Sequence, residues 1–225
     1  MEALERFGEL MGRPPHQVPL DEAALCLAAV AQPGLDVAGE LTRLDELAID
    51  VAAPTLDVLV AAMFGSGRFS GNSADYYDPR NSYLDQVMTR GVGIPISLSI
   101  LAMEVGRRAG VPLAGVGMPG HFLLRDQVDP TVYVDPFNGG RLLGAADCRA
   151  LFMRSMGRQA AWHDGYLAPV TRAAIIERVL ANLRLTFQRA GDRAGLRSVM
   201  RLRVRCPGAT ADDQSELARL TADLN

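Results

Sequence analysis

The segment between Gly93 and Gly110 constrains the fold most, because it carries both the start and the stop of a long helix. Pro95 suits the first turn of a helix, where its missing N–H has no helical partner. Gly110 suits the residue after the last turn, where a left-handed backbone conformation commonly ends a helix. We therefore predict a long central helix that runs from Pro95 through Arg108.

Short strands and polar turns follow the central helix. Brief runs of β-branched and aromatic residues bounded by Gly, Pro and Asp are typical of strands. The second and third runs form an antiparallel pair across the turn at 126–130. The predicted strands are Leu113–Gly117, His121–Arg125, Thr131–Asp135 and Arg141–Leu143, and a predicted helix at Ala145–Met153 follows them.

Helical patterns flank this centre on both sides, and Gly and Pro residues separate them. The predicted helices are Leu20–Ala31, Val37–Val51 and Pro54–Met63 before the centre, and Ala173–Ala190, Ala194–Arg205 and Asp212–Leu224 after it. We therefore expect an α+β fold in which helices pack on a small antiparallel sheet, with a helical N-terminal portion and a helical tail.

The length of 225 residues suits one domain with a small appendage. We predict a first unit at residues 1–168 and a helical tail at residues 169–225. The break at Gly191-Asp192 makes the tail resemble a tetratricopeptide-like helix pair. One pair is too little for a repeat array, because a solenoid generally needs roughly three or more repeats.

The composition excludes several classes of function. The formal net charge is -3 and all 23 basic residues are Arg, so the chain has neither a Schiff-base lysine nor a P-loop lysine. No long basic stretch precedes Arg197–Arg205, which gives nucleic-acid binding little support. His16 and His163 form no cluster with acids at ligand spacing, so we expect no metal and no other cofactor.

The cysteines and the N-terminus indicate the compartment. Cys26, Cys148 and Cys206 are odd in number and widely spaced, which fits a reduced cytoplasmic interior better than a disulfide scaffold. The N-terminus lacks the basic start and the apolar run of a signal peptide. No run reaches the ~18 apolar residues of a spanning helix. We expect a cytoplasmic protein that binds no membrane.

Two residues of the predicted strands provide proton-transfer chemistry. His121 follows Pro119-Gly120 at the start of one strand, and Asp135 ends the next strand. Their separation is 135 − 121 = 14 residues, so a short hairpin brings them side by side. A carboxylate beside a His orients the imidazole for proton transfer. We predict an imidazole-to-carboxylate distance near ~3 Å.

Four ordered motifs carry a resemblance to a known family. They are YYDPRNS at Tyr76–Ser82, GIPISLS at Gly93–Ser99, GVGMPGHFL at Gly115–Leu123 and DPFNGG at Asp135–Gly140. Together they resemble the transglutaminase-like (papain-related) superfamily, and in particular its bacterial SirB-one-type branch. The resemblance covers residues 20–145 well and the tail weakly. It implies a core in which a Cys begins a helix, a His lies on a following strand and an Asp lies on the next.

The register of these motifs places Pro95 where active members of the superfamily have the nucleophilic Cys. A pyrrolidine ring cannot attack a carbonyl, whereas the thiolate is the competent nucleophile in this chemistry. The nearest downstream thiol, Cys148, lies on a later predicted helix. The resemblance therefore implies a pseudoenzyme, a non-catalytic transglutaminase-like protein whose cleft binds a peptide or protein partner.

The alternative function is a hydrolase or acyltransferase that uses His121 and Asp135 with Ser97 or an activated water. In either case the candidate site comprises the triad remnants His121 and Asp135 and the binding residues Pro95, Ser97, Tyr77, Arg80, Asn81 and Phe122. We expect the loop 75–82 to border the cleft, because rigid aromatics and arginine are common at binding hot spots.

The structural alternative for this loop is a network of side-chain-to-backbone bonds that only holds it in place. We also predict that Ser82 is the N-cap of the helix that follows the loop, with Asp85 three residues on as in a capping box.

Overall fold

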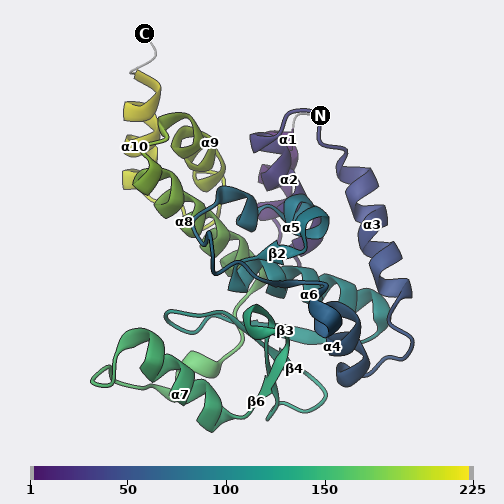
Figure 1. The fold of residues 1–225 in the computed structure, drawn as a ribbon. Helices are drawn as coiled ribbons and strands as arrows, with labels where there is room; N and C mark the ends of the chain where they lie inside the picture. Colours follow the sequence, from purple (N-terminus) through teal and green to yellow (C-terminus); the bar gives the residue numbers. More distant parts are fainter. Residues whose placement is uncertain (1–2, 223–225) are drawn as a thin grey trace.

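The central helix is the element around which the chain packs. In the computed structural model, which describes residues 3–222, α6 (Pro95–Ala109) is buried along most of its length. Pro95 is its first residue, and Gly110 follows its end with a left-handed backbone at φ 78°, as predicted. Figure 1 shows α6 between the N-terminal helices and the sheet.

A four-stranded antiparallel sheet packs against α6. Its strands lie side by side in chain order: β3 (Leu113–Val116), β4 (Leu123–Asp126), β5 (Tyr133–Asp135) and β6 (Arg141–Leu143). In the β4–β5 pair, Leu124 lies opposite Val134. The predicted antiparallel pairing is confirmed, although His121 lies two residues before β4 rather than at its start.

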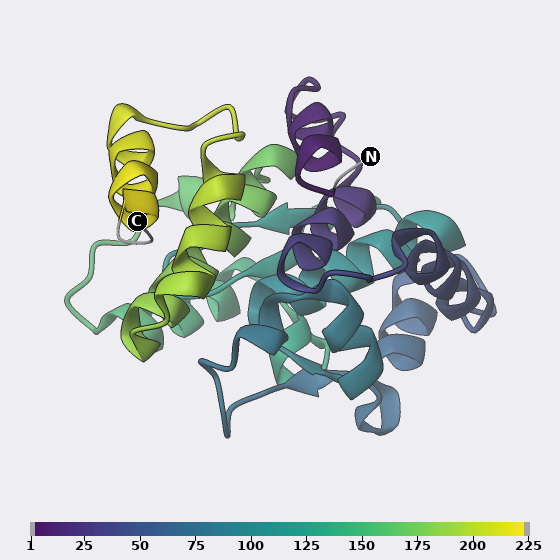
Figure 2. The same cartoon turned by 90° about the horizontal axis from the view of Figure 1, so that it is seen from above.

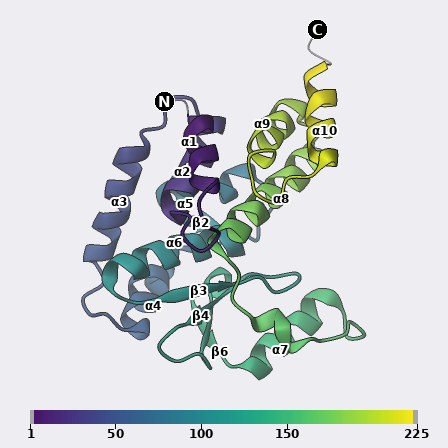
Figure 3. The same ribbon diagram turned by 180° about the vertical axis from the view of Figure 1, so that it is seen from behind.

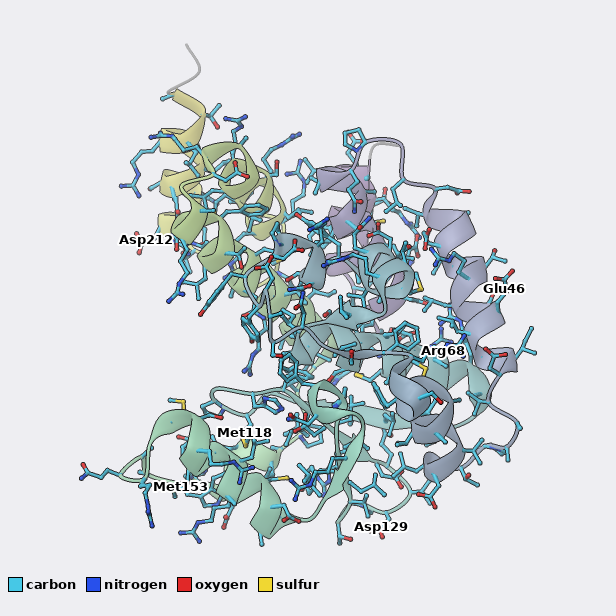
Figure 4. The ribbon with its side chains drawn as sticks, in the orientation of Figure 1. Glu46, Arg68, Met118, Asp129, Met153 and Asp212 are labelled. Atoms are coloured by element: carbon cyan, nitrogen blue, oxygen red, sulfur yellow. The ribbon has the colours of Figure 1, made fainter. Side chains whose placement is uncertain are left out.

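Side chains alternate along the strands, so the sheet has two apolar faces. Leu124 belongs to the main core with α6, whereas Leu123 belongs to a second, smaller core with α7 (Ala145–Met156). Met118 and Met153, both labelled in Figure 4, are part of this second core. The sheet is therefore covered on both faces.

Helices α2 to α5 pack directly on α6, and α1 packs on α2. Figure 3 shows α3 on the flank of α6 that is opposite to the C-terminal helices. The bounds are α1 (Ala3–Met11), α2 (Leu20–Ala31), α3 (Val37–Ile49), α4 (Leu56–Phe64) and α5 (Leu84–Arg90). Strands β1 (Ser70–Gly71) and β2 (Val92–Gly93) form a short parallel pair that the sequence did not predict.

The C-terminal part consists of α8 (Arg172–Ala190), α9 (Arg193–Arg203) and α10 (Ala211–Ala222). Ile176 and its neighbours on α8 belong to the main core, and α9 contacts α1 and α2. Figure 2 shows the C-terminal helices, coloured green to yellow, on the same side of the molecule as the purple N-terminal helix. Residues 223–224 of the last predicted helix lie outside the described part. The predicted boundary between residues 168 and 169 stays a prediction. No helix among residues 3–222 is both long and apolar enough to cross a membrane.

The predicted α+β fold is confirmed, but the predicted cap at Ser82 is wrong. Ser82 ends a 3₁₀ turn at Pro79–Ser82, and Tyr83 is the N-cap of α5 without a side-chain hydrogen bond. Asp78 caps the 3₁₀ turn instead, because its Oδ1 accepts from the backbone N–H of Arg80 at 2.9 Å. The Asp-Pro pair thus begins a turn of its own and shifts the start of α5 by one residue.

Candidate ligand-binding site

The hydroxyl of Ser97 fixes the N-terminus of α6 to the loop that precedes α5. Its Oγ accepts from the backbone N–H of Ile94 at 3.1 Å and donates to the carbonyl of Asn81 at 2.5 Å. Ser97 is only 1% exposed, and it does not line the pocket that lies beside this helix end. The hydroxyl therefore supports the backbone and is not available to a ligand.

His121 and Asp135 form a buried pair. His121 Nε2 lies 2.8 Å from Asp135 Oδ1, so the predicted proximity is confirmed. The side-chain amide of Asn138 donates to Asp135 Oδ2 at 2.6 Å. Burial alone would raise the pKa of Asp135, but the hydrogen bonds from His121 and Asn138 outweigh it and lower that pKa. The ionised carboxylate orients the imidazole.

The second imidazole nitrogen of His121 is free for a ligand. Its Nδ1 forms no hydrogen bond with any residue in the described range, although the side chain is only 8% exposed. The ring meets Phe137 edge-on, with the centroids 6.2 Å apart. With the proton on Nε2, Nδ1 offers a lone pair, and in the protonated ring both nitrogens donate.

A guanidinium from α8 holds the turn that carries His121. One terminal nitrogen of Arg178 donates to the carbonyl oxygens of Met118 at 2.8 Å and His121 at 2.9 Å. The guanidinium also lies over the ring of Phe122, 5.5 Å from its centroid. No Asp or Glu in residues 3–222 forms an ion pair with it, and burial lowers its pKa. Arg178 thus determines where the His121 turn lies.

These groups surround a pocket of about 230 Å³ beside the N-terminus of α6. This volume is smaller than the ~300–1,000 Å³ of drug-sized ligand sites, so the pocket suits one side chain or a chain end. No described residue on its wall is acidic. The wall consists of Tyr76, Pro95, Ile96, Gly120, His121, Phe122, Arg178 and Asn182.

The structure places three of the predicted site residues on this wall, namely Pro95, His121 and Phe122. The sequence interpretation missed Arg178 and Asn182, which come from a helix far along the chain. Their spacing of four residues places them on one helix face. The pattern alone does not indicate that this face meets the pocket.

Three residues of the loop that precedes α5 were predicted to bind a ligand, but they do not line the pocket. Tyr77 is 44% exposed and lies under the guanidinium of Arg189 at 4.3 Å rather than on the pocket wall. Arg80 forms its ion pair within the loop. Asn81 is fully buried, and its amide holds the loop by donating to a loop carbonyl at 2.7 Å. Only Tyr76 of this loop lines the pocket.

No cysteine supplies a thiol to the pocket wall. Cys26, Cys148 and Cys206 are free and buried. Burial raises the pKa of Cys26 and Cys148 to about 11 and that of Cys206 to about 12. Such thiols stay protonated near neutral pH and are poor nucleophiles. The described residues also contain no group of three or more His, Cys, Asp or Glu that could hold a metal ion.

A buried helix that starts beside a His–Asp pair on an antiparallel sheet is the core arrangement of transglutaminase-like proteins. The family described as "Transglutaminase-like superfamily" matches residues 32–181. The chain therefore belongs to the transglutaminase-like superfamily. The match ends within α8 and includes Arg178.

Three relatives with known sequences are similar to half or more of this chain. A UPF0162 protein of Pseudomonas aeruginosa is 34% identical over 206 residues, which cover 87% of this chain and 75% of the relative. A UPF0162 protein of Xylella fastidiosa (strain Temecula1) is 48% identical over 124 residues, which cover 53% of this chain but only 44% of that relative. F-box only protein 21 of Mus musculus is 39% identical over 124 residues, which cover 51% of this chain and 19% of that protein. No solved structure matches the chain.

Proposed function

We propose that the protein is a non-catalytic member of its superfamily whose pocket binds a peptide or protein partner. The observation that carries the proposal is Pro95, which is the first residue of α6 and lines the pocket with His121. By resemblance, active members have their nucleophilic Cys at this position. Proline offers neither a side-chain nucleophile nor a backbone N–H there.

The neighbouring groups do not replace the missing thiol. The hydroxyl of Ser97 is held between two backbone groups, and burial keeps Cys148 protonated. The pocket nevertheless keeps the features of a binding site. Tyr76 and Phe122 give it aromatic walls, and Asn182 forms no side-chain hydrogen bond with any described residue. Unpartnered polar groups beside aromatic rings favour recognition of a short polar segment.

A similar domain also occurs inside a longer protein. The matched segment covers only 19% of F-box only protein 21, so a similar fold occurs there as one part of a longer chain. We further propose that the protein belongs to the SirB-one-type branch, because it carries all four motifs of that branch, and that it acts in the bacterial cytoplasm. The packing of α9 on α8 supports a partial tetratricopeptide-like tail that offers the partner a second surface.

Selection of a random peptide-display library on the purified protein tests this function. We expect enriched peptides to bind the wild type and to lose about tenfold in affinity, or ~1.4 kcal/mol, with Asn182→Trp, which fills the pocket. Leu185→Trp is the matched control, because Leu185 is exposed on the same helix outside this pocket. Peptides that bind Asn182→Trp as tightly as the wild type would place the partner elsewhere.

A hydrolase or acyltransferase in which His121 activates water is the second candidate. The carboxylate-oriented imidazole with a free Nδ1 favours it. Turnover of activated esters or amides that is lost in His121→Gln and kept in His163→Gln would establish this candidate. Labelling with thiol- and serine-directed acylating probes, followed by peptide mapping, would identify any covalent nucleophile and overturn the non-catalytic proposal.

A further inference from the structure

The polar side chains on the pocket wall keep hydrogen-bonding groups without partners. Arg178 uses one terminal nitrogen for the His121 turn, while its Nε and its other terminal nitrogen form no hydrogen bond with any described residue. Asn182 and the hydroxyl of Tyr76 likewise form no side-chain hydrogen bond within residues 3–222. The wall therefore offers a ligand several N–H and O–H donors, together with the acceptor oxygens of Asn182 and Tyr76.

Arg178 is also a partly buried cation without a counter-ion in the described part of the chain. Asp135, the acid of the His121 pair, is occupied by His121 and Asn138. Removing a guanidinium from water costs free energy that an opposite charge offsets. The lowered pKa of Arg178 has the same cause, namely burial. A negatively charged ligand is thus the partner that this wall lacks.

We infer that the pocket anchors its peptide partner through a carboxylate group, an inference that rests on the proposed function. The Nε and the other terminal nitrogen of Arg178 keep N–H groups that can donate to a carboxylate oxygen, because only one terminal nitrogen is used for the His121 turn. Asn182 lies one turn further along α8 and adds a donor beside it.

Charge and size favour a carboxylate over a phosphate. Arg178 is the one lining side chain that is always charged, and its single charge balances a single negative charge. A phosphate group carries about −1.5 to −2 near neutral pH and would leave charge unbalanced. The pocket of about 230 Å³ suits a carboxylate with a short apolar neighbour. The carboxylate is either the C-terminus of a peptide or the side chain of an Asp or Glu.

Two pairs of synthetic peptides test the inference and separate these sources. The first pair is acetyl-Ala-Ala-Tyr-Ala-Ala with a free C-terminus and its C-terminal amide. The second pair is acetyl-Ala-Ala-Glu-Ala-Ala-amide and the same peptide with Gln in place of Glu. We expect the acidic member of at least one pair to bind about tenfold more tightly than its neutral partner. Its titration should shift the NMR signals of the Asn182 side-chain amide and the His121 ring.

Two variants locate the binding without disturbing the His121 turn, which Arg178 itself supports. Asn182→Asp places a fixed carboxylate beside Arg178, so it should lower the affinity for the acidic peptide about tenfold. Gln188→Glu makes the same charge change at an exposed position of α8 and should leave the affinity unchanged.

The outcomes distinguish this inference from the function on which it rests. If the neutral peptides bind as tightly as the acidic ones and Asn182→Trp weakens both, peptide binding stands and the carboxylate anchor is wrong. If Asn182→Asp binds the acidic peptide as tightly as the wild type does, the anchor is also wrong. If neither these peptides nor the display library binds the wild type, both proposals fail.

Discussion

Buried charges are paired with opposite charges at one end of α6 but not at the other. Towards the C-terminal end, the buried carboxylate of Glu104 accepts from Arg107 at 2.8 Å and Arg108 at 3.1 Å, and Arg172 lies 3.4 Å from its other oxygen. At the N-terminal end, Arg178 bonds only to carbonyl groups. The first cluster satisfies its own charges, whereas the second leaves donors for a ligand. A buried charge therefore indicates a binding site where it lacks a counter-ion.

The Glu104 cluster balances its charges because further acids join it, although Oε1 of Glu104 has the ion pair with Arg172 and no hydrogen bond. Asp21 and Asp45 accept from Arg108 at 2.8 Å and 2.6 Å. Three carboxylates thus meet three guanidiniums, so the cluster has no net charge. Burial, with the nearby charge of Asp21, still raises the pKa of Glu104. The cluster holds elements together, but each member depends on the others.

The largest expected effect follows from breaking the charge-balanced Glu104 cluster. Glu104→Gln removes its central charge and leaves the arginines with fewer partners, so we expect it to lower the free energy of unfolding by about 3 kcal/mol. Urea denaturation measures this loss. Glu46→Gln is the control, because Glu46, labelled in Figure 4, is exposed on α3. A loss no larger than that of the control would mean that the cluster does not stabilise the fold.

Removing the carboxylate of the site should have a smaller effect that depends on pH. The folded-state pKa of Asp135 is lowered, so its contribution to stability is present above the ordinary Asp pKa and is lost as the pH falls through the lowered value. Asp135→Asn should lower the free energy of unfolding by about 1–2 kcal/mol near neutral pH. Below about pH 4, the free energy of unfolding of this variant should decrease less steeply with falling pH than that of the wild type.

Denaturation across this pH range checks the sign of the effect. Asp57→Asn makes the same charge change at an exposed position of α4. An acid limb that remains as steep in Asp135→Asn as in this control would show that other groups cause the loss of stability in acid.

Two serines of α6 test whether the site end of the helix is held by its loop. Ser97→Ala removes the hydroxyl that bonds to the N–H of Ile94 and to the carbonyl of Asn81. These two groups keep only their long mutual bond of 3.4 Å, so we expect a loss of about 2 kcal/mol. Ser99 bonds only to the carbonyl of Pro95 one turn earlier, so Ser99→Ala should cost about 0.5 kcal/mol. Equal losses in thermal denaturation would contradict the role assigned to Ser97.

A substitution on the pocket wall should have the smallest effect on stability. Asn182 is half-buried and has no side-chain partner among the described residues, so Asn182→Leu should change the free energy of unfolding by less than about 0.5 kcal/mol. Binding of acidic peptides should nevertheless weaken. A large loss of stability in this variant would remove the contrast between the two ends of α6.

Features that depend on near neighbours could be predicted from the sequence. Pro95 and Gly110 mark the ends of α6 because proline and glycine have fixed roles at helix ends. The spacing of His121 and Asp135 predicts their contact because a hairpin joins them directly. The strand order follows for the same reason, since each strand pairs with the next one along the chain.

Features that depend on distant segments could not be predicted in this way. Arg178 reaches the turn of His121 across 57 residues, and no local pattern shows which face of α8 meets that turn. Asn81 resembled a recognition residue, but the loop folds back and buries it. Strands β1 and β2 have two residues each, which is too short for a periodic pattern.

The contact between Arg178 and the His121 turn also sets when the pocket is complete during synthesis. The N-terminal part of a chain leaves the ribosome first. The hairpin of His121 and Asp135 therefore emerges well before the arginine that fixes its turn, 57 residues after His121. A nascent or truncated chain that ends before α8 has the hairpin but lacks one wall of the pocket. Under the proposed function, only chains synthesised past α8 present the whole pocket to a partner.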